Sequence, residues 1–118
     1  MPAPFPMSST EVTGTAAAAT TVTLAAAPGV RRTVAAVTVS CSGAASGPIT
    51  LSITDGATVV WNTDLTLALE VPQSPLVAPV LCGAGNAVAI TASAGAASCV
   101  VKINVEYFDT VPGNNPSA

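Results

Sequence analysis

Short runs of alternating apolar and polar residues, rich in Val, Ile and Thr, recur along the whole chain. These three β-branched types make up 35 of the 118 residues. Their side chains are stiff at χ1 and fit a pleated sheet better than a helix. The clearest run is 99–108, in which one face carries Val101, Ile103, Val105 and Tyr107. The pattern predicts an all-β fold.

Glycine and proline divide these runs into short segments. The chain contains nine glycines and ten prolines, spread along its length, and pairs such as Pro28-Gly29 are typical of turns. Asp55-Gly56 lies between two alternating runs, where both residue types tolerate positive φ, so it predicts a hairpin. About eight short strands separated in this way predict an antiparallel β-sandwich or jelly roll.

The alternation also predicts which side chains face the core. In the run 32–42 we expect Val37, Val39 and Cys41 on one face and Val34 with Thr38 on the other. Residues 11–24 read as an alanine-softened strand region, and residues 64–70 as another strand with three leucines on one face. Together these expectations place the sandwich domain at residues 11–108.

The two ends of the chain differ in composition from this domain. Pro2, Pro4 and Pro6 each fix φ, which predicts an extended N-terminal arm over residues 1–10. Phe5 is the apolar side chain on that arm that we expect to contact a partner. Residues 109–118 are rich in Pro, Gly and Asn and predict a loose C-terminal tail.

Charge is scarce, which excludes several classes of function. The chain has three basic and six acidic residues and no histidine. Three cations cannot neutralise a run of phosphates, so we expect no nucleic-acid partner. No segment approaches the ~20 apolar residues of a membrane span, so we expect no membrane partner. A surface with so few charges favours association with other protein chains.

The reactive residue types do not form a catalytic pattern. The carboxylates read as solvated or turn residues, and serine nucleophiles lack a base. Cys41, Cys82 and Cys99 make an odd count without metal-ligand spacing; Cys41 and Cys99 read as buried, and Cys82 beside Gly83 as more exposed. We therefore expect no catalytic, cofactor or metal site, reduced thiols and no enzyme activity.

Three segments resemble a known family. They are Leu65-Thr66-Leu67-Ala68-Leu69, the stretch 79–90 (PVLCGAGNAVAI) and the final run 101–107. Together with the block 33–54 they are similar to the small jelly-roll decoration (cement) proteins of tailed bacteriophage heads. The resemblance covers about residues 33–108, and its motifs are mostly turn glycines and alternating apolar residues.

The resemblance implies a structural virion protein. Such a protein would form a homotrimer on the major capsid protein lattice, stabilise the head and lie on the outer surface of the virion. The start of the chain does not read as a signal peptide, which agrees with assembly in the host cytoplasm. Arg31 and Arg32 are two of the three cations, and we expect them to contact acidic residues of the lattice.

Other functions fit parts of the same pattern. A phage tail or fibre component would share the low charge. A carbohydrate-binding β-sandwich module would use Trp61 or Tyr107 as a stacking platform. A pilin-like or adhesin-like subunit would need a secretion signal.

Overall fold

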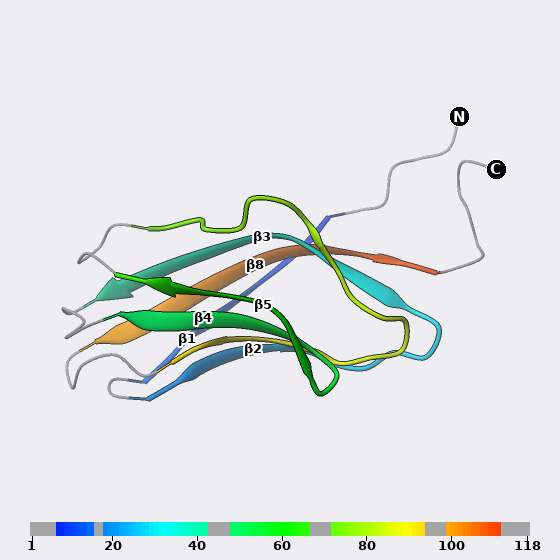
Figure 1. Ribbon diagram of the computed structural model, residues 1–118, viewed down its shortest axis with the longest axis horizontal. Helices are drawn as coiled ribbons and strands as arrows, with labels where there is room; N and C mark the ends of the chain where they lie inside the picture. Colours follow the sequence, from blue (N-terminus) through cyan, green and yellow to red (C-terminus); the bar gives the residue numbers. More distant parts are fainter. Residues whose placement is uncertain (1–6, 16–17, 43–47, 67–71, 94–98, 112–118) are drawn as a thin grey trace.

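The computed structural model describes residues 7–15, 18–42, 48–66, 72–93 and 99–111, and it is all-β. Figure 1 looks onto the faces of two packed sheets. Eight strands form them: β1 (Ser8–Thr13), β2 (Thr20–Leu24), β3 (Arg31–Ser42), β4 (Ile49–Asp55), β5 (Thr58–Leu65), β6 (Val80–Leu81), β7 (Val88–Ala92) and β8 (Val100–Thr110). The predicted β-sandwich is confirmed.

The strands pair in a first-with-last order. β1 pairs with β8, β2 with β7, β3 with β6 and β4 with β5, all antiparallel. The chain is therefore one long hairpin whose turn joins β4 to β5. Additional pairing of β8 with β3 and of β7 with β4 rolls this hairpin into a first sheet, β1-β8-β3-β6, and a second sheet, β2-β7-β4-β5. This eight-stranded order is that of a jelly roll.

Small aliphatic side chains fill the space between the sheets. Val, Ile and Leu from β2, β3, β4, β7 and β8 alternate inward, and most are completely buried. The larger Trp61 and Tyr107 are only partly buried and pack against this cluster from its margin. The face predicted for the last strand is confirmed, because Val101, Ile103 and Val105 are all buried.

One prediction about β3 is wrong because the strand contains a β-bulge. Val34 pairs with Tyr107 and Ala36 with Glu106, so Ala35 is an extra residue in β3. An extra residue reverses the face on which the preceding side chains lie. Val34 therefore points into the core together with Val37 and is fully buried, although plain alternation places the two on opposite faces.

Three of the turns that the sequence predicts contain a glycine with positive φ. Gly29, Gly56 and Gly85 all have positive φ, the conformation that glycine adopts without steric cost. The β4–β5 hairpin is confirmed, but Asp55 is its last strand residue and pairs with Thr58. The two turn residues are therefore Gly56 and Ala57, one position later than the Asp-Gly pair suggests.

The region 11–24 is divided between the two sheets. Gly14 ends β1 by donating its N–H to the Val101 carbonyl at 2.8 Å, and β2 starts in the other sheet at Thr20. A Cβ on Gly14 would lie 1.9 Å from Thr20 Oγ1. Glycine thus permits the close approach at this corner, a requirement that alternation does not reveal.

Two expected boundaries move by a few residues. β1 begins at Ser8, so the last three residues of the expected arm 1–10 are strand; residues 1–6 lie outside the described residues. β8 continues through Thr110, two residues into the expected tail, and residues 112–118 are not described. The strand expected over 64–70 is β5 as far as Leu65, while residues 67–71 lie outside the described part.

Asp55 fastens the β4–β5 hairpin to the loop between β6 and β7. One carboxylate oxygen accepts the Gly83 N–H at 2.8 Å, and the other accepts Asn86 Nδ2 at 2.9 Å. The Gly56 N–H also reaches the Ala87 carbonyl at 2.9 Å. These bonds hold two neighbouring loops together at one end of the sandwich.

We predict that Asp55→Ala lowers the free energy of unfolding by about 1–3 kcal/mol, because it removes two charge-assisted hydrogen bonds, one of them from a part-buried N–H. Urea denaturation measures the change. Asp64→Ala is the matched control, since Asp64 is exposed and, among the described residues, accepts a hydrogen bond from the Thr50 hydroxyl alone. Equal losses in the two variants would contradict a special role for Asp55.

Candidate interaction surface

The charged side chains are concentrated on the first sheet. Of the eight charged residues that the structure describes, six belong to it: Glu11, Arg31, Arg32, Lys102, Glu106 and Asp109. The described strands of the second sheet carry two charged residues, Asp55 at the hairpin and Asp64. The two outer faces of the sandwich therefore differ in chemistry.

The outer face of the second sheet is rich in hydroxyl groups. Thr21 and Thr23 on β2 are exposed, as are Thr50 on β4 and Asn62 on β5. Thr21 and Thr91 share a hydrogen bond of 3.1 Å between their hydroxyls, and Thr50 donates to Asp64 at 2.8 Å. Apart from the exposed Val59 and Val60 near the β4–β5 hairpin, the described part of this sheet presents short polar side chains and a single carboxylate to solvent.

Large apolar side chains are exposed at one end of the first sheet. Leu81 is 64% exposed, Met7 55% and Val111 48%. Leu81 is paired with Thr33, which is paired with Phe108, and Met7 directly precedes the residue paired with Tyr107. We call Met7, Leu81, Phe108 and Val111 the apolar end.

Arg31 lies at this apolar end. It is paired with Thr110 on the adjacent strand β8. Its Nε is buried and has no hydrogen-bond partner among the described residues. A buried donor of this kind gains stability when it finds an acceptor. The partner contact expected for Arg31 stays a prediction.

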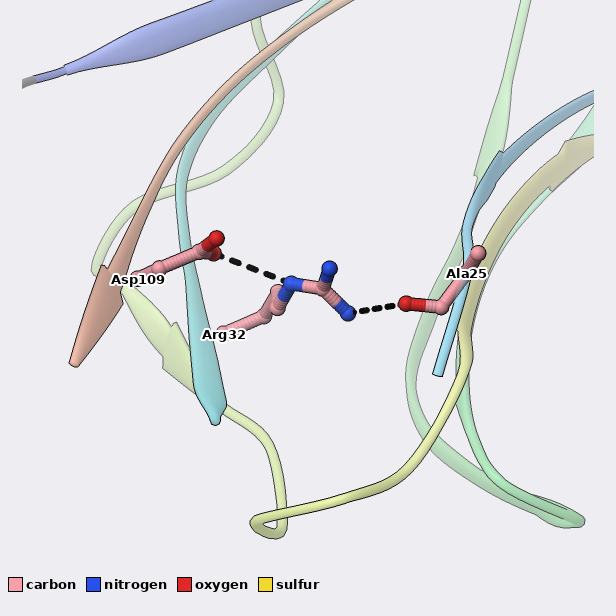
Figure 2. A network of polar contacts seen from close by, with 3 residues as sticks. All are labelled: Ala25, Arg32 and Asp109. Atoms are coloured by element: carbon pink, nitrogen blue, oxygen red, sulfur yellow. Dashed lines mark hydrogen bonds and ion pairs between the residues drawn. The ribbon is translucent and has the colours of Figure 1, made fainter. Parts of the chain in front are cut away.

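Arg32 is used within the fold. Its Nε lies 2.9 Å from Asp109 Oδ1, and its Nη1 donates to the Ala25 carbonyl after β2 (Figure 2). The Arg32 side chain is only 11% exposed. Arg32 therefore bridges the two sheets at the end where β3 begins and β8 finishes. This internal role argues against the expected contact with a lattice. Sequence alone could not separate the two arginines, because the pairing partner lies 77 residues away.

The other expected contact residues are not brought together. Phe5 lies outside the described residues. Trp61 is on β5 in the second sheet and Tyr107 on β8 in the first, and both pack against the core. The two rings consequently do not form one stacking platform.

A groove of about 400 Å³ lies at the other end of the first sheet. Its polar groups are three hydroxyls and one ammonium, and Lys102 Nζ lies 3.9 Å from Glu11 Oε1. The lining residues are Thr13, Ser40, Cys41, Ser42, Pro72, Val100 and Lys102. Among these residues no general base stands beside a hydroxyl, and no group of three potential metal ligands occurs anywhere in the described chain.

All three cysteines are buried, and none of them is joined in a disulfide. The burial expected for Cys41 and Cys99 is confirmed, whereas the greater exposure expected for Cys82 is wrong: it is 2% exposed. Burial, reinforced by the negative charge of Asp55, raises the pKa of the Cys82 thiol, so the reactive thiolate is disfavoured.

No helix capable of crossing a membrane occurs in the described residues. Comparisons of the chain with protein-family models, with curated proteins and with solved structures gave no match.

We predict that the native protein resists thiol reagents. At pH 8, Ellman's reagent should label none of the three cysteines until denaturant is added, because all are buried and the pKa of Cys82 is raised. Absorbance at 412 nm follows the reaction. Rapid labelling of any thiol in the folded protein would contradict this protection by burial.

Proposed function

We propose that the protein is a structural virion subunit, a decoration protein that docks as a trimer on the major capsid protein lattice of a tailed bacteriophage head. The jelly-roll topology supports this proposal, since viral capsid domains commonly have it. The resemblance in the segments 65–69, 79–90 and 101–107 supports it as well.

The observation that carries the proposal is the apolar end. Exposed Met7, Leu81 and Val111 stand beside Arg31, whose Nε lacks a partner. Water-exposed apolar side chains with one unsatisfied cationic donor fit a protein surface of mixed apolar and acidic character. Full burial of one such side chain contributes roughly 1.5–3 kcal/mol.

Three copies would multiply this modest energy. In a trimer the second and third ends bind at high effective concentration once the first is attached. The proline-rich segment before Ser8 extends the contact, because proline has already lost part of its conformational freedom. Phe5 supplies the apolar anchor there.

We predict that Leu81→Glu weakens attachment to undecorated phage heads at least tenfold, because it places a charge in the apolar contact. Pelleting of the full-length protein with purified heads measures attachment. Val77→Glu is the matched control: Val77 is 98% exposed and lies outside the apolar end. Equal attachment by both variants would contradict docking through this end.

Deletion of residues 1–6 tests the arm separately. Because β1 starts at Ser8, this deletion leaves every described strand intact, and we expect an unchanged melting temperature with weaker pelleting. If mass spectrometry of intact particles finds the chain in tails instead of heads, the tail or fibre alternative replaces the head proposal. Absence from all particles would overturn both.

A further inference from the structure

We propose that copies of this chain join edge to edge through the second sheet, with β5 of one copy pairing with β2 of the next in a closed ring. The number of copies, three, rests on the trimer of the proposed function. The location of the joint is inferred from the edge strands of the two sheets.

The two sheets protect their edges differently. In the first sheet, β6 has only two residues and follows Pro79, and β1 carries Glu11, whose carboxylate faces Lys102. In the second sheet, β5 has eight residues and β2 has five, and neither contains Pro, Lys or Arg. Short strands, prolines and lysines are usual protections against edge pairing, and both edges of the second sheet lack them. The edge strand β5 carries one charged residue, Asp64, and a bulge at its hairpin end. We call these two edges unprotected.

The free main-chain groups of these edges can be assigned from the ladder. Ser93 N–H donates to the Thr50 carbonyl at 2.9 Å, so the main-chain groups of Thr50 face β7. In an antiparallel ladder each residue turns both groups to the same side, and the side alternates. With the observed register, Asn62 and Asp64 on β5 face outward, as do Thr21 and Thr23 on β2.

The direction of the strands allows the joint. β2, β7, β4 and β5 alternate in direction, so the two edge strands run opposite ways. When copies are related by rotation about an axis along the strands, β5 of one copy and β2 of the next are therefore antiparallel. Three copies joined in this way would form one continuous, closed antiparallel sheet.

The lengths and side chains of the two edges also match. A bulge at the hairpin end leaves Trp61–Leu65 as the regular part of β5, five residues against the five of β2. One register sets Thr23 opposite Asn62 and Thr21 opposite Asp64, so that each pair exchanges both main-chain hydrogen bonds. The threonine hydroxyls then lie beside an amide and a carboxylate on the same outer face.

A ring uses both unprotected edges, whereas a two-fold pair would use only one. Pairing of β5 with itself leaves β2 open for further growth, and a head-to-tail joint that closes leaves neither edge free. The ring therefore accounts for two edges on one sheet that both lack proline, lysine and arginine.

Proline substitutions at the outward N–H groups test the joint. Proline is tolerated on edge strands where its missing N–H faces away from the sheet. In native mass spectrometry the full-length protein should have the mass of three chains. The variants Asn62→Pro and Thr23→Pro should each have the mass of one chain and keep the circular dichroism spectrum of a β-sheet protein. Ser9→Pro, which by the same alternation removes an outward N–H from the β1 edge, is the matched control and should remain trimeric.

A covalent test does not depend on how well the proline variants fold. The double variant Thr23→Cys/Asn62→Cys should oxidise to a disulfide-linked trimer, and neither single variant should. Loss of assembly in Asn62→Pro alone would indicate pairing of β5 with itself and overturn the ring. A monomeric wild-type chain that still pellets with phage heads would overturn the joint while leaving the proposed docking in place.

Discussion

The ladder between β3 and β8 is the interaction on which the rest of the fold depends. It runs from Arg31 paired with Thr110 to Ser42 paired with Val100 and joins the two halves of the chain. β1 and β6 attach to its two sides, and its inward residues form the larger part of the core contributed by the first sheet. Without this ladder the long hairpin would not roll up, and neither sheet would have a partner to cover its apolar face.

Alternation and turn chemistry account for most of the fold. The run 99–108 and the glycines at 29, 56 and 85 lie where the pattern puts them, because a two-residue period and positive φ are local properties. The errors arise from non-local packing. The bulge at Ala35 exists only in relation to β8, and the closeness of Gly14 to Thr20 exists only once the two sheets meet.

The candidate surface is harder to predict from the sequence than the fold is. Arg31 and Arg32 are neighbours with the same chemistry. Asp109 forms an ion pair with Arg32, whereas the buried Nε of Arg31 has no hydrogen-bond partner among the described residues. Leu81 reads as an ordinary strand residue, and only the pairing with Thr33 shows that it faces solvent at the sheet end. A surface is formed by residues that are distant in the chain. Local sequence patterns therefore identify the residue types that can contribute to it, but not how these residues are arranged.

The first-with-last pairing has a consequence for how the protein is made. β1 pairs with β8, so Ser8 meets a partner 99 residues later in the chain. Such long-range contacts raise the contact order and slow folding, because loop closure must precede any gain from pairing. Among the described strands, β4 and β5 are the pair that a short turn connects, whereas β1 has no partner until β8 has been synthesised. Completion of the first sheet is thus a late step in the folding of this domain.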